Sequence, residues 1–212
     1  MESSKSSLKG KLLRHVLRIQ DQLFGRPFPR MKRIPQITSS HCGPAVLASL
    51  FSFVGANVSQ KKITGSLRAQ NKIKKLGLNM RDMAKAAKIY SQGGKYVFWK
   101  KANGTISDLD KIVNKYKFPV GVEWQGVFYE EADEDNGHYS IVTQVKKDKG
   151  YLRMADPYYK FVGHDRKFRN EFFLKRWWDT NIIKKKEIYD RRVLFVIVPK
   201  KEVWPKKLGM SK

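Results

Sequence analysis

The apolar positions of the chain fall into patterns typical of a buried helix and of several strands. Residues 42–54 are apolar on nearly every side of a helical projection, which predicts a helix inside a larger core, capped by one of the Ser and Thr residues at 38–40. Residues 138–145 and 151–155 are rich in Val, Ile, Tyr and Thr, and the turn residues between them predict a hairpin. Residues 193–198 form a continuous apolar run, as expected of a strand buried on both faces. These patterns together predict an α+β fold.

The N-terminal residues have a different pattern. Between Leu8 and Leu23 leucine and valine recur at helical spacing with Lys and Arg in between, and a Pro-containing segment at 26–30 ends the pattern. We expect a basic amphipathic extension at 1–33, one domain at 34–200 and a basic C-terminal tail at 201–212. The extension is open to three interpretations: a helix packed on the domain, a helix on a membrane surface, or a propeptide-like cover over the cleft.

The net charge and the number of cysteines limit the kinds of protein that the chain can be. The chain has 212 residues, with 44 Lys and Arg against 19 Asp and Glu, and a net charge of +25. Such an excess favours binding to nucleic acid or to an anionic membrane. A single cysteine excludes an internal disulfide framework and a multi-cysteine zinc site. Since no apolar run reaches the ~20 residues of a membrane span, and no signal-peptide pattern is seen, we expect a cytoplasmic protein.

The charge is unevenly distributed, and this changes the interpretation. Residues 36–60 carry no charged side chain, whereas residues 118–138 carry six carboxylates and no Lys or Arg. Polyanion binding explains neither segment. The first contains Cys42 at the predicted start of the buried helix, where the helix dipole and free amide groups favour a thiolate. The commoner role of a lone cysteine is structural, and that alternative stays open.

A thiolate nucleophile needs a base, and the base needs a group that orients it. His41 is adjacent to Cys42 in sequence, and neighbouring residues on a helix do not face each other. His138 opens the first strand of the predicted hairpin, and Asp156 follows the second. In an antiparallel hairpin the start of one strand lies beside the end of the next, so we expect Asp156 to lie near His138 and to hold its tautomer.

These motifs resemble cysteine peptidase family thirty-nine and its standalone relatives. The likeness rests on Gln36, on the Cys-Gly-Pro-Ala sequence that begins at Cys42, on the Gly-His-Tyr around His138, and on the Asp-Pro at Asp156, and it extends from about Gln36 to about Trp178. The family implies a papain-like fold in which a helical half carries the nucleophile and a twisted antiparallel sheet carries the His and Asp. It implies Cys42 as nucleophile, His138 as general base and acid, Asp156 as its orienting group and Gln36 as an oxyanion-hole donor. No cofactor and no metal are expected.

An acidic segment directly precedes His138. Its carboxylates could form a solvated loop tip, or they could overhang the cleft and select basic peptides. A calcium loop is disfavoured because the ligand spacing of a known motif is absent. The carboxylates are Glu130, Glu131, Asp133, Glu134 and Asp135.

The sequence therefore predicts a thiol-dependent peptidase that acts on a peptide or protein substrate. An acyltransferase or a deamidase would use the same acyl-enzyme, so both remain alternatives. The alternative from another class is a non-catalytic module that binds nucleic acid or an anionic membrane through its Lys and Arg side chains, which would place the protein at the membrane periphery.

Overall fold

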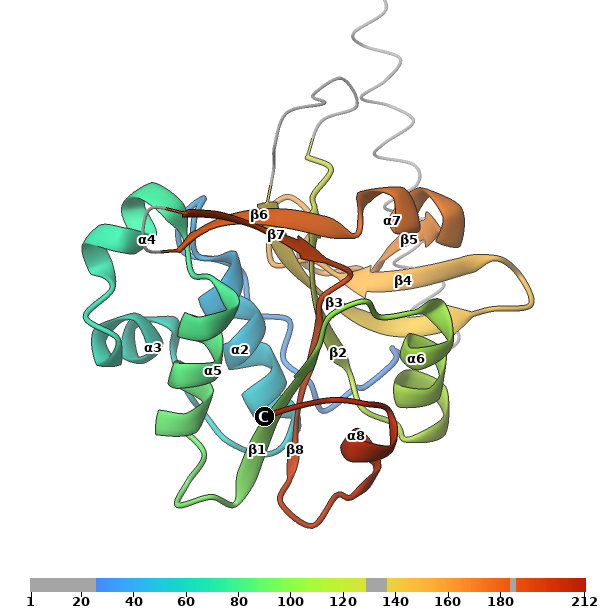
Figure 1. Cartoon of the computed structure of the whole chain (residues 1–212), viewed down its shortest axis with the longest axis horizontal. Helices are drawn as coiled ribbons and strands as arrows, with labels where there is room; N and C mark the ends of the chain where they lie inside the picture. The colour runs from blue at the N-terminus through green and yellow to red at the C-terminus, as the bar shows by residue number, and fades with distance from the viewer. Residues whose placement is uncertain (1–25, 129–136, 184–185) are drawn as a thin grey trace, which may run out of the picture.

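Helices form one side of the molecule and an antiparallel sheet forms its centre (Figure 1). The structure is a computed structural model that describes residues 26–128, 137–183 and 186–212. None of the helices it describes is long and apolar enough to cross a membrane. The helical side consists of α2 (Cys42–Phe53), α3 (Gln60–Ser66), α4 (Gln70–Leu76) and α5 (Met80–Ile89).

Six strands form the main sheet in the order β1-β8-β2-β3-β4-β5, and all of its pairs are antiparallel. The last strand in sequence, β8, lies between β1 and β2. A separate hairpin, β6–β7, lies across the top of the molecule in Figure 1. The strands are β1 (Tyr96–Lys101), β2 (Val120–Gln125), β3 (Gly137–Lys146), β4 (Tyr151–Ala155), β5 (Arg166–Arg169), β6 (Trp178–Ile183), β7 (Lys186–Arg191) and β8 (Leu194–Pro199).

Both faces of the sheet are buried, because each packs against its own group of helices. On β8, Phe195 and Ile197 point into the core shared with α2, whereas Leu194, Val196 and Val198 point into a second core. This arrangement confirms the prediction of a strand buried on both faces. The second core is covered by α6 (Ile106–Asp110), the π-helix η1 (Lys111–Lys115), α7 (Asn170–Arg176) and α8 (Trp204–Lys207).

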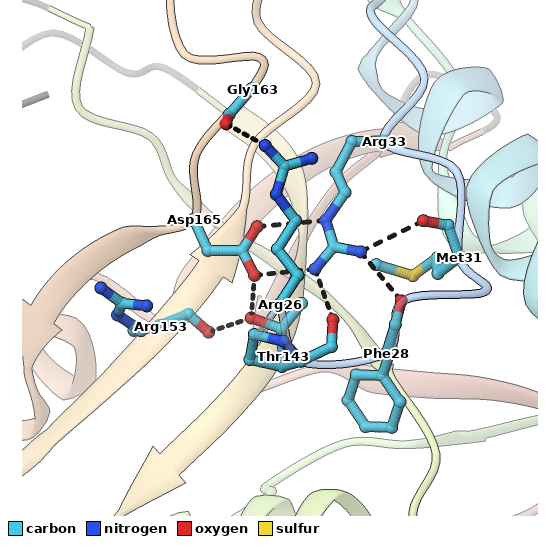
Figure 2. A network of polar contacts seen from close by, with 9 residues as sticks. Arg26, Phe28, Met31, Arg33, Thr143, Arg153, Gly163 and Asp165 are labelled. Carbon is cyan, nitrogen blue, oxygen red and sulfur yellow. Dashed lines mark hydrogen bonds and ion pairs between the residues drawn. The ribbon is translucent and has the colours of Figure 1, made fainter. Parts of the chain in front are cut away.

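A polar clasp ties the segment before α2 to the sheet (Figure 2). The guanidinium of Arg33 donates to both carboxylate oxygens of Asp165, at 3.2 and 2.9 Å, and Thr143 Oγ1 donates to the same carboxylate at 2.7 Å. Arg33 and Asp165 are both buried, with side-chain exposures of 8% and 0%. Arg33 also donates to the carbonyl oxygens of Pro27, Phe28 and Met31. Residues 27–33, which we expected to belong to an extension, are thus fixed against the domain.

The C-terminal residues also pack on the domain. Trp204 and Met210 are buried in the second core, and residue 211 forms a two-way backbone bridge with Lys100 at the end of β1. Residues 201–212 are therefore integrated with the domain, although we expected them to form a tail. The amphipathic segment predicted at residues 8–23 lies outside the described residues.

Candidate active site

Cys42 is the first residue of α2, and the helix places its side chain at the start of a buried segment. The residue is 8% exposed and lines the wall of a cleft. Our expectation of a Ser or Thr cap is wrong: the N-cap residue is His41, and no side chain caps the helix. Thr38 Oγ1 bonds instead to Nδ1 of His41. The amide groups beside Cys42 therefore have no capping side chain and are available to an anionic oxygen.

His138 and Asp156 come together at the end of the β3–β4 hairpin that lies away from its turn. His138 is the second residue of β3, Asp156 directly follows β4, and Ile141 pairs with Ala155 between them. The imidazole Nε2 lies 2.9 Å from Asp156 Oδ1, and the two side chains are 2% and 1% exposed. The Cys42 side chain also interacts with the imidazole, and this interaction raises the pKa of His138. The structure thus brings together the three residues that the sequence indicated.

The charges around the imidazole favour its protonated form. Burial by itself lowers the pKa of His138, but the charge and hydrogen bond of Asp156, together with Cys42, outweigh it and raise the pKa to about 10. Burial raises the pKa of Asp156, whereas His138, Arg166 and the Tyr158 amide lower it, and the net direction is down. Both pKa shifts favour an imidazolium paired with a carboxylate, the form that stabilises a thiolate partner.

Aromatic side chains shield this pair from water. The ring of Phe128 meets the imidazole edge-on, with centroids 4.8 Å apart, and Tyr158 packs on Phe128 at 4.9 Å. Excluding water strengthens the interaction between His138 and Asp156 by lowering the local dielectric constant.

Gln36 lies near the start of α2, but its amide hydrogens are already engaged. Nε2 donates to the carbonyl oxygens of Thr38 and Ser39, at 2.9 and 2.8 Å, and the backbone N–H of Gln36 donates to Pro157 at 2.8 Å. Oε1 is buried and has no partner among the described residues. In this state Gln36 shapes the loop before Cys42. A role as oxyanion donor requires one of its two amide bonds to be exchanged for the substrate.

A cleft of about 710 Å³ opens beside Cys42. The loop at Gly77–Asn79 and the basic residues Lys72 and Lys74 form one side, and β6–β7 forms the other with Asp179 and Glu187. The hairpin approaches the base closely, since a Cβ on Gly137 would lie 2.5 Å from Asp179 Oδ1. Glycine is thus required next to His138. The wall lining also includes Ser39, Ser40, Leu76, Tyr139, Thr180, Asn181 and Ile182.

Comparison with known proteins identifies the family of the chain. Residues 28–182 match the sequence model of the Peptidase_C39 like family. The chain belongs to this family. Membership places it among the cysteine peptidases, and the match ends before β7 and β8. No curated protein sequence matches the chain.

Two solved structures share the papain-like fold of this C39 family member. The peptidase domain of Streptococcus ComA, a bifunctional ABC transporter involved in a quorum-sensing pathway, is 23% identical over 78% of this chain and 96% of its own, with a TM-score of 0.52. A double-glycine-motif protease from an AMS/PCAT transporter, solved in complex with the leader peptide, is 17% identical over 82% of this chain and 94% of its own, with a TM-score of 0.53.

The sequence did not indicate a role at the site for two charged residues, Arg166 and Glu123. Arg166, at the start of β5, donates to Asp156 Oδ2 at 2.9 Å. Glu123 is buried in β2, where its Oε1 accepts from Tyr139 at 2.5 Å and from Asn181 at 3.0 Å. A glutamate inside the apolar run of β2 is a detectable signal of a buried polar network. Arg166 has no comparable signal, because its role depends on strand pairing.

The acidic carboxylates at residues 130–135, expected to form either a solvated loop tip or an overhang of the cleft, lie outside the described residues. Within the parts of the chain that are described, no group of three or more His, Cys, Asp or Glu side chains has the arrangement of a metal site.

Proposed function

We propose that this C39 family member hydrolyses peptide bonds through an acyl-enzyme at Cys42. The observation that carries the proposal is the buried 2.9 Å contact between His138 Nε2 and Asp156 Oδ1. Cys42 interacts with the same imidazole. The arrangement holds the imidazole in one orientation, in the protonated form that both stabilises a thiolate and supplies a proton later.

The reaction follows from these positions. The sulfur of Cys42 attacks the substrate carbonyl carbon. The resulting oxyanion accepts a hydrogen bond from the Cys42 amide and from Gln36, whose Nε2 exchanges its bond to Thr38 or Ser39 for this one. His138 then gives its proton to the departing amine as the C–N bond breaks, which leaves a thioester. A water molecule, deprotonated by His138, attacks the thioester carbon; the C–S bond breaks, the acid is released, and Cys42 returns to the thiolate beside a protonated His138. Asp156 keeps the imidazole aligned throughout.

A peptide is the proposed substrate. The fold is shared with a protease that was solved in complex with the leader peptide. The cleft beside Cys42 is lined by a loop and by the β6–β7 hairpin. Hydrolysis is favoured over acyl transfer because the family is one of peptidases. Selection of basic substrates by the acidic segment at 130–135 stays a prediction.

The proposal is tested with a thiol-reactive peptidyl vinyl sulfone and intact-protein mass spectrometry. The wild type should take up one label, and Cys42→Ala none. His138→Ala should slow labelling by about 10²-fold or more, as expected when a general base is lost. His41→Ala is the matched control, because this neighbouring imidazole bonds to Thr38 and should leave the rate unchanged. Equal rates in His138→Ala and the wild type would refute the mechanism.

A further inference from the structure

Asp156 uses its two carboxylate oxygens for different partners. Oδ1 accepts from His138 Nε2 at 2.9 Å and from the backbone N–H of Tyr158 at 3.0 Å. Oδ2 accepts from Arg166 Nη1 at 2.9 Å. The carboxylate is 1% exposed, so Arg166 supplies a full positive charge at a point that water cannot reach. An uncompensated carboxylate at this depth would be strongly disfavoured.

Arg166 is itself held in place from several directions. Its Nη2 donates to the carbonyl oxygen of Val127 at 2.8 Å, and its guanidinium carbon lies 3.7 Å from the ring centroid of Phe161 and 4.8 Å from that of Phe168. Val127 precedes Phe128, the ring that covers His138. One guanidinium thus fixes both the carboxylate and the end of the segment that shields the imidazole.

The backbone that presents Arg166 is also anchored. Arg166 pairs with Met154 across β4 and β5, and the preceding residue, Asp165, is the buried acceptor of the Arg33 clasp (Figure 2). The side chain therefore has little freedom to swing away from Asp156. Such restraint distinguishes a built arrangement from a surface ion pair.

We propose that Arg166 is a positioning residue of the peptidase, which keeps Asp156 ionised and aimed at His138 and so completes a chain from Cys42 through His138 and Asp156 to Arg166. This inference rests on the proposed function. With the arginine present, the thiolate, imidazolium, carboxylate and guanidinium form two balanced charge pairs. Without it, the reactive state carries one uncompensated negative charge, so it forms only at higher pH.

The test is the pH dependence of alkylation by iodoacetamide, because Cys42 is the chain's single cysteine and every alkylation reports on it. In the wild type we expect reactivity to extend to acidic pH. In Arg166→Met and Arg166→Gln, the fall in the alkylation rate on the acidic side of the pH–rate profile should shift to higher pH. Alkylation at about pH 5.5 should slow roughly tenfold, since an adjacent opposite charge shifts a pKa by about one unit or more. Arg166→Lys should restore most of the rate. Lys167→Met, an exposed neighbour on the same strand, is the control and should match the wild type.

The outcomes separate the two proposals. If wild-type alkylation rises only near the ordinary thiol pKa of about 8.5, the thiolate–imidazolium pair and with it the proposed function fail. If the wild type has the acidic limb and both neutral variants keep it unchanged, the role of Arg166 is refuted. Circular dichroism and thermal unfolding establish that each variant is folded, and Arg166→Gln retains a donor for Asp156 should the methionine variant unfold.

Discussion

Replacing Glu123 by glutamine should flatten the pH dependence of stability over the mildly acidic range. Glu123 is 1% exposed on β2, and Asp179 on β6 is hydrogen-bonded to it as well. Oε2 of Glu123 has no hydrogen-bond partner among the described residues, so an ionised Glu123 would leave a buried and unsolvated carboxylate oxygen. Burial raises the pKa of Glu123 to about 7, with Asp190 adding to the rise and the bonds from Tyr139, Asn181 and Asp179 opposing it.

The size of the pH effect on stability follows from the raised pKa of Glu123. A carboxyl whose pKa is higher in the folded state binds its proton more tightly when folded. Its contribution to stability is therefore complete below the unfolded value of 4.5 and is lost as the pH rises through about 7. One pKa unit corresponds to about 1.4 kcal/mol, so about 2 kcal/mol should disappear between about pH 5 and pH 7. This corresponds to a fall of about 4–8 °C in Tm for a domain of this size.

Urea unfolding at several pH values measures how the free energy of unfolding changes with pH. The glutamine would keep an acceptor for Tyr139 and Asn181 and would not ionise in this pH range. The unfolding free energy of Glu123→Gln should therefore fall about 2 kcal/mol less than that of the wild type over this range. Glu187→Gln, which replaces an exposed carboxyl on β7, is the matched control and should keep the wild-type slope. Parallel slopes for wild type and Glu123→Gln would refute a proton held at Glu123.

Three further predictions concern the packing, the clasp and the base. Gly121→Ala should lower the free energy of unfolding by about 1–3 kcal/mol or more, and Tm with it, because the new Cβ would lie 2.2 Å from the Phe195 ring. A Tm within about 1 °C of the wild type would contradict this packing. Asp165→Asn should cost about 3–5 kcal/mol in urea unfolding, because it leaves Arg33 buried without its counter-ion; an unchanged midpoint would contradict the clasp. Peptidase activity should persist on the alkaline side until the pH approaches about 10, where His138 loses its proton, and a loss near pH 7 in a pH–rate profile would contradict the raised pKa.

The parts of the fold that local pattern determines were predictable. The buried helix expected at 42–54 is α2, and the hairpin expected at 138–155 is formed by β3 and β4. The proximity of His138 and Asp156 followed from antiparallel geometry, whereas the one-residue shift in the β3–β4 pairing between Val142 and Gln144 has no signal in the sequence. These features depend on residues close together in sequence.

The remainder depends on contacts between distant segments. Arg166 meets Asp156 only because β5 pairs with β4 after a loop. Asp179 reaches the edge of the cleft only because β6 folds over β3 and forms a hairpin with β7. Neither pairing has a turn or periodicity that specifies it from nearby residues.

The central position of β8 has a consequence for how the enzyme is made. Because β8 fills the space between β1 and β2, a nascent chain that has emerged only to residue 182 has the nucleophile and the base but leaves both strands with unpaired edges. Such edges recruit other strands, and closing them requires pairing between segments nearly a hundred residues apart along the chain. The six-stranded sheet can therefore close only after the segment that forms β8 has been synthesised.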